Sequence, residues 1–179
     1  MRVSIIFLIF LSCQSDYTPK PKAYIKISFP EKNYIKLDDN KLQYSFLYPT
    51  YSELDINNNK FIDVKFPDFS GTLHLTYVNL KDNLLEHIEQ SRSLAYKHNN
   101  QADVISEQVF ISDKDNVYGM LYDYEGVTAT SSQFYLTDSV EHFFRGSFYF
   151  NTAISDSIYP INSFVKEDIM VLIESLRWK

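Results

Sequence analysis

The chain has 179 residues, a formal net charge of −6 and an aromatic content of 16%. This length suits one folded domain with its own core. The acidic balance, without any basic stripe, argues against nucleic acid and anionic lipid surfaces as partners. A single cysteine excludes an intramolecular disulfide, so the fold must rely on its core.

The first residues predict a lipoprotein signal peptide that covers residues 1–12. Arg2 is a short basic segment, and residues 3–11 form an apolar run. As a helix this run would span only about 14 Å, against about 30 Å of bilayer hydrocarbon. Cys13 follows directly, and its thiol can form a thioether to diacylglycerol, which gives stable anchoring when two or more acyl chains are present. An ordinary signal peptide with an incidental Cys13 is the alternative.

The residues after Cys13 bear on location and reach. An acidic residue at this point is the general inner-membrane retention signal, and Gln14 is not acidic, so we expect an outer-membrane anchor. Alternating prolines and lysines make residues 13–23 an extended tether. At about 3.1 Å per residue, this tether reaches roughly 30 Å. We expect residues 24–179 to form one globular domain that faces the periplasm.

Alternating apolar and polar residues predict strands on both sides of a mid-chain helix. The predicted strands cover residues 24–29, 42–48, 61–66, 72–77, 104–111, 117–124, 131–136 and 141–150. Short connections join the last four strands, which predicts an antiparallel meander. The last strand carries aromatic residues on both faces, so we expect it to lie centrally in the sheet.

Two segments show the helical period. Apolar or small residues recur every three or four positions from Leu80 to His98, and again across residues 160–176, where Pro160 suits a first turn. The predicted fold class is α+β. We expect a largely antiparallel sheet of six to eight strands, with the mid-chain helix and the C-terminal helix packed on it.

The sequence offers little for catalysis or metal binding. It contains no nucleophile elbow and no glycine-rich phosphate loop. Residues 55–59 begin like a calcium loop, but Lys60 stands where the loop needs glycine. His74 and His142 leave open a metal site across strands, although hydrogen-bonded histidines are the commoner explanation. We therefore predict no catalytic residue, no metal and no cofactor.

The mid-chain helix keeps a polar flank towards its C-terminal end. The residues of this flank that predict a contact surface for a protein partner are Arg92, Tyr96, His98 and Asn99. A solvated flank in which Arg92 pairs locally with Glu89 or with an acidic residue at the sheet edge is the simpler alternative. Both interpretations stay open at the level of sequence.

Several blocks of the sequence resemble one protein family. They are Cys13, residues 19–24, 29–31, 71–77, 91–98, 133–139, 142–146 and 174–178. Together they resemble the GldD family of gliding-motility lipoproteins of Bacteroidota, from the signal peptide to the last residues. Residues 53–60 carry no motif of this family.

The resemblance implies a lipoprotein that is required for gliding and for the type IX secretion machinery, with Cys13 lipidated and no catalytic residue set. The order of elements is similar to the PsbP/Mog1-like layout. We expect a non-enzymatic protein that supports assembly or stability of this machinery through contacts with other gliding and secretion envelope proteins. The alternatives are a periplasmic small-ligand-binding protein, a hydrolytic enzyme with a pocket between sheet and helices, and an envelope binding module unrelated to motility.

Overall fold

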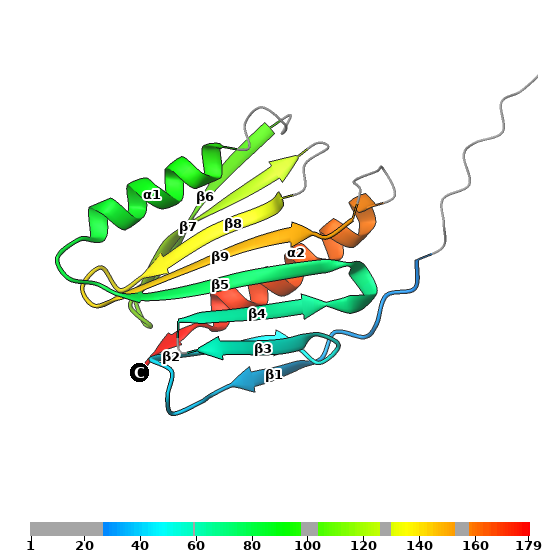
Figure 1. The fold of residues 1–179 in the computed structure, drawn as a ribbon, viewed down its shortest axis with the longest axis horizontal. Coiled ribbons are helices and arrows are strands. Elements are labelled where there is room, and N and C mark those ends of the chain that lie inside the picture. The colour runs from blue at the N-terminus through cyan, green and yellow to red at the C-terminus, as the bar shows by residue number, and fades with distance from the viewer. Residues whose placement is uncertain (1–26, 59, 98–103, 126–129, 153–157) are drawn as a thin grey trace, which may run out of the picture.

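A computed structural model describes residues 27–58, 60–97, 104–125, 130–152 and 158–179. These residues form a seven-stranded antiparallel sheet, a three-stranded sheet and two α-helices (Figure 1). In spatial order, the large sheet contains β3 (Glu53–Asn58), β4 (Phe61–Phe66), β5 (Gly71–Asn79), β9 (His142–Phe150), β8 (Thr130–Thr137), β7 (Val117–Glu125) and β6 (Val104–Ser112). The other elements are β1 (Tyr34–Leu37), β2 (Tyr44–Pro49) and β10 (Arg177–Trp178) of the small sheet, the 3-10 turn η1 (Pro67–Phe69), α1 (Leu84–Tyr96) and α2 (Tyr159–Ser175).

The strand β9 lies at the centre of the large sheet, as predicted. It pairs with β5 on one side and with β8 on the other. The four strands from β6 to β9 are neighbours in chain order, which confirms the meander. Successive residues of a strand point to opposite faces, and accordingly Phe144 lies in the main core while Phe143 lies in a second cluster. The α+β class is confirmed.

The main core fills the space between one face of the large sheet and a layer formed by α2 and the small sheet. Figure 1 shows α2 crossing behind the large sheet. The helix buries one stripe at helical spacing, and its buried residues are Val165, Asp168, Ile169, Leu172 and Ile173. Aromatic rings of the two sheets meet beside this stripe, with the Tyr44 and Phe144 ring centres 4.7 Å apart.

A smaller cluster lies on the opposite face, beneath α1. Ser91 and Ala95 are the buried residues of this helix. The hydroxyl of Tyr124 donates to the carbonyl oxygen of Ala95 at 2.9 Å, and the Tyr135 and Phe143 rings stack with their centres 5.4 Å apart. Because few residues of α1 are buried, most of the helix surface stays available for other contacts.

One carboxylate builds the turn between β8 and β9. The Oδ1 atom of Asp138 accepts hydrogen bonds from the backbone N–H groups of Val140, Glu141 and His142 at 3.0, 2.9 and 2.8 Å. Ser139 adopts a left-handed backbone with φ of 71°. Burial alone would raise the pKa of Asp138, but the three N–H donors hold this pKa below its ordinary value.

We expect Asp138→Ala to lower the free energy of unfolding by about 1 kcal/mol, because the turn loses its acceptor. The pKa of Asp138 is lower in the folded state, so its contribution is complete above the unfolded value of about 3.9 and is lost as pH falls through the folded value. Urea unfolding at neutral pH and at pH about 3 measures both effects. Asp138→Asn keeps an oxygen acceptor and should lose less at neutral pH; equal stability of Asp138→Ala and the parent would contradict the role of this turn.

The strand predicted over residues 24–29 is wrong where the structure describes it. Residues 27–33 form no helix or strand, and residues 24–26 lie outside the described part of the chain. The Phe29 ring stacks on Phe164 of α2 with centres 4.5 Å apart. Packing of this ring on a helix, rather than pairing of its backbone, therefore holds the segment.

Other boundaries differ for local reasons. The helix α1 begins at Leu84 rather than Leu80, because the Leu80 N–H donates to the Glu141 carbonyl at 2.7 Å and Asp82 has a left-handed φ of 56°. The strands β1, β3 and β10 were not predicted. In β3, Leu54 and Ile56 alternate with polar residues, but residues 55–59 were interpreted as the beginning of a calcium-loop pattern, and β10 has only two residues.

Candidate interaction surface

The predicted lipid attachment site lies outside the described residues. This holds for Cys13 and the tether 13–23, and also for His98 and Asn99 of the predicted contact flank. Lipidation of Cys13 and the role of the tether therefore stay predictions. In the ranges that the structure describes, no helix is long and apolar enough to cross a membrane.

The other two residues of the predicted flank, Arg92 and Tyr96, meet on the outer surface of α1. The guanidinium carbon of Arg92 lies 5.9 Å from the centre of the Tyr96 ring, within cation–π range. The Tyr96 hydroxyl donates to Glu107 Oε1 of β6 at 2.7 Å, and this hydrogen bond raises the pKa of Tyr96. An open hollow of about 400 Å³ is lined by Glu89, Arg92, Ser93 and Tyr96.

The strand β6 continues this surface with apolar side chains. Val109 and Ile111 are 62% and 65% exposed. They alternate with Phe110, which packs against the main core, and so lie on the face that carries Glu107 and α1. We call the set formed by Arg92, Tyr96, Glu107, Val109 and Ile111 the α1–β6 surface.

The two edges of the large sheet differ in regularity. β6 pairs with β7 through nine consecutive residues without a register shift, whereas the pairing of β3 with β4 is irregular between Ile56 and Asn58. Irregular pairing is one way in which proteins protect a sheet edge. Within the described chain β6 has a strand on one side only, so its outer backbone groups are open for pairing.

Blocks of the sequence that resemble one family meet in space. The Tyr77 hydroxyl lies 2.8 Å from His142 Nδ1, and the His142 ring stacks on Trp178 with centres 4.9 Å apart. Arg145 Nη2 donates to Gln133 Oε1 at 2.9 Å, and burial lowers the pKa of Arg145. These contacts between blocks hold the C-terminus and the neighbouring strands in place.

The histidines left open as a metal site do not converge. His74 lies beside Asp63, with Nδ1 and Oδ1 2.7 Å apart, and His142 contacts Tyr77 on the opposite face of the sheet. One ion therefore cannot bind both histidines. The described residues contain no group of three histidine, cysteine, aspartate or glutamate residues that could hold a metal. Asp55 pairs with Lys65 at 2.6 Å across a strand pair, rather than forming part of a calcium loop.

The fold is that of a PsbP-like α+β domain. The solution structure of cyanobacterial PsbP (CyanoP) from Synechocystis sp. PCC 6803 matches with a TM-score of 0.54, covering 87% of this chain and 98% of that chain at 12% identity. At this identity the likeness shows the fold alone. The comparison with curated proteins found no match.

The model of one family, described as gliding motility lipoprotein GldD, matches residues 14–178. The chain belongs to the GldD family of gliding-motility lipoproteins. The predicted resemblance is therefore confirmed along nearly the whole chain, and this membership makes the protein a membrane-anchored lipoprotein associated with gliding motility.

Proposed function

We propose that this protein is a non-enzymatic lipoprotein that supports assembly or stability of the gliding-motility and type IX secretion machinery through protein–protein contacts. Diacylglycerol and a fatty acid such as palmitate on Cys13 anchor it in the outer membrane, and the tether holds its domain in the periplasm. Membership of the GldD family supports the link to gliding. The regular, apolar edge strand β6 is the observation that carries the contact part.

The occupant that fits β6 is an extended segment of another envelope protein of this machinery. A strand added to a sheet edge gains main-chain hydrogen bonds, and pockets for alternate side chains give specificity. Val109 and Ile111 supply the apolar contacts, and the stacked pair of Arg92 and Tyr96 lies on the same face. Tyrosine and arginine are enriched among residues that dominate binding energy.

We expect the double variant Val109→Lys/Ile111→Lys to abolish gliding while the protein accumulates normally. Two lysines on an edge strand oppose pairing with a partner strand. Both side chains are largely exposed, so the free energy of unfolding should change by less than about 1 kcal/mol. Colony spreading, the amount of secreted protein and the amount of this protein in the envelope are measured together.

The matched control is Ile35→Lys/Ile56→Lys. These isoleucines are 47% and 44% exposed and belong to the small sheet and to the irregular edge of the large sheet. The control receives the same change of charge and should glide normally. Normal gliding of Val109→Lys/Ile111→Lys, or an equal defect in the control, would rule out β6 as the contact edge.

A further inference from the structure

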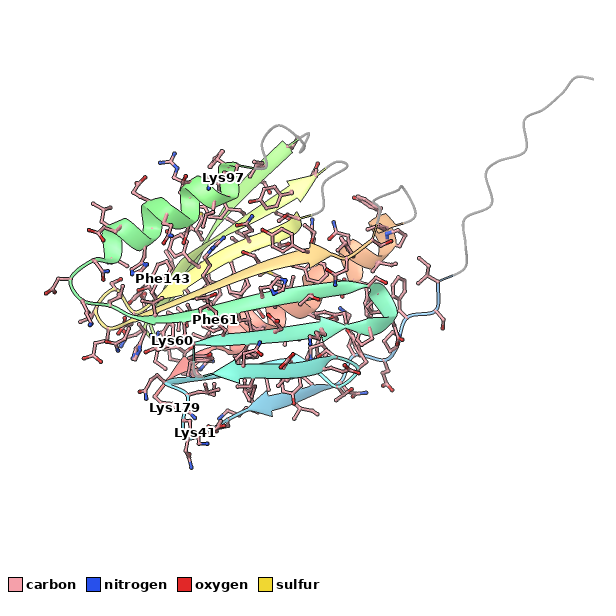
Figure 2. All side chains as sticks on the ribbon, viewed as in Figure 1. Lys41, Lys60, Phe61, Lys97, Phe143 and Lys179 are labelled. Atoms are coloured by element: carbon pink, nitrogen blue, oxygen red, sulfur yellow. The ribbon has the colours of Figure 1, made fainter. Side chains whose placement is uncertain are left out.

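A basic hollow lies at the corner where β5 leads into α1. Its volume is about 530 Å³, which lies within the usual range for small-ligand sites. The described residues that line it are Lys41, Gln43, Lys60, Tyr77, Val78, Asn79, Lys81, Asn83 and His87, and they include no carboxylate. Three lysines thus line one hollow in a chain whose net charge is −6. Figure 2 shows Lys41 and Lys60 at one end of the molecule.

Local hydrogen bonds fix the backbone that carries each lysine. The turn before β2 is closed by Asp39, whose Oδ1 accepts from the Lys41 N–H at 2.9 Å. The Lys60 carbonyl accepts from the Tyr77 N–H of β5 at 2.8 Å. The Lys81 N–H donates to Asn83 Oδ1 at 2.9 Å. The three side chains therefore start from positions that are set before any ligand binds, which lowers the ordering cost of binding.

Neighbouring charges leave two of these lysines without a counter-ion. Asp38 is engaged by Lys36 at 2.7 Å and by Lys179 at 2.6 Å, and these lysines lower the pKa of Asp38 to about 2. In contrast, Lys41 and Lys81 form no ion pair with any residue that the structure describes. Asp38 is thus engaged by lysines outside the hollow, and none of the described residues that line the hollow is acidic.

The rest of the wall carries amide, phenol and imidazole groups, which can form hydrogen bonds with a ligand. Asn83 Nδ2 and His87 Nε2 lie 3.2 Å apart, within hydrogen-bond distance. The His87 ring packs on Phe143 with centres 5.2 Å apart. Burial raises the pKa of Tyr77, which keeps its phenol neutral. Amide groups of Gln43 and Asn79 complete a wall that suits hydroxyl groups beside an anion.

We propose that this hollow is a binding site for the phosphate group of a small hydroxyl-bearing phosphate ester, free or as a lipid headgroup. Lysine binds phosphate as a compact point charge with three rotatable donors, and the lining of the hollow includes three lysines. A concave site that concentrates one sign of charge also attracts the opposite charge from solution. This site is distinct from the α1–β6 surface and does not depend on the proposed protein contacts.

The test is calorimetric titration of the full-length protein in neutral detergent with glycerol 3-phosphate, with inorganic phosphate as a second probe. Phosphatidylglycerol vesicles and phosphatidylcholine vesicles are compared by flotation. We expect saturable binding that weakens with salt, and a loss of at least about tenfold in affinity in Lys41→Gln/Lys81→Gln, since each lysine forms a charge-assisted hydrogen bond.

The matched control is Lys65→Gln/Lys97→Gln. Lys65 lies near the end of β4 opposite to Lys60, and Figure 2 shows Lys97 well away from Lys41 and Lys60, so this variant should bind within about twofold of the parent. Binding of glycerol 3-phosphate identifies a free ester as the ligand class, and binding of phosphatidylglycerol vesicles alone identifies a lipid headgroup. Absence of binding to every phosphate probe, or equal losses in both double variants, overturns the proposal. Circular dichroism of both variants shows that each is folded.

Discussion

Cys13→Ser is expected to move the protein from the membrane fraction to the soluble fraction and to stop gliding. Serine cannot form the thioether, and each buried acyl chain contributes on the order of 10 kcal/mol to membrane attachment at about 0.8 kcal/mol per methylene. Cys13 is the only cysteine of the chain, so no other thiol can replace it. Fractionation, labelling with a palmitate analogue and colony spreading measure the three consequences.

Two further variants distinguish loss of the lipid anchor from failure to export the protein to the periplasm. The first combines Cys13→Ser with an ordinary cleavable signal peptide in place of residues 1–12, which delivers a soluble domain to the periplasm. The second, Gln14→Ala, keeps the cysteine and should remain in the membrane and glide. Full motility with the soluble form would contradict the anchoring part of the proposed function.

Asp168→Ala is expected to lower the free energy of unfolding by about 3 kcal/mol. The change removes a buried acceptor and leaves the hydroxyl and ammonium groups that bind it without a partner. The Asp168 side chain is 1% exposed. Its oxygens accept from the Tyr34 hydroxyl at 2.9 Å and from the Tyr51 hydroxyl, and Lys32 Nζ lies 3.2 Å away. Burial and the hydrogen bonds to Asp168 raise the pKa of both tyrosines. This network ties the first described part of the chain to α2.

Glu167 provides the matched control, since it is the preceding residue on the same helix and is 69% exposed. It also pairs with Lys32, at 2.8 Å, but its own carboxylate stays largely exposed to solvent. Glu167→Ala should therefore change the free energy of unfolding by less than about 1 kcal/mol. Urea unfolding of both variants measures the difference. Similar losses for Asp168→Ala and Glu167→Ala would mean that the buried network does not stabilise the domain.

The sequence predicted well those elements whose apolar residues can be buried in only one kind of secondary structure. The stripe through Val165, Ile169 and Leu172 has only one way to be buried, as a helix on the sheet. The strand containing Phe143 and Phe144 has aromatic side chains on both faces, which suits only the middle of the sheet.

The elements that were missed depend on partners distant in sequence. The two residues of β10 become a strand only because Ser45 and Tyr44 pair with them. Phe29 follows strand-like residues, yet its ring packs on α2. An alternating pattern predicts which residues share one face of a strand. It does not predict which strands are neighbours in the sheet, because that order is set by tertiary pairing.

The same reason limits what the sequence shows of the candidate surface. Arg92 and Tyr96 were predicted from their spacing on one helix face, and the structure places them together. The alternation of residues 104–111 predicts a strand with Val109 and Ile111 on one face. That these two side chains are exposed follows from the edge position of β6, which only the structure shows. The basic hollow brings together lysines from three separate connections, which no local pattern could reveal.

The proposed function requires that β6 contacts another protein of the gliding and secretion machinery. Site-specific photo-crosslinking in the native envelope tests it, with a benzophenone side chain at position 109 and, as the matched control, at position 56 on the opposite edge. If β6 is the contact edge, position 109 yields a discrete adduct with a component of this machinery and position 56 yields none. Absence of such an adduct at position 109, or the same adduct from both positions, would contradict it.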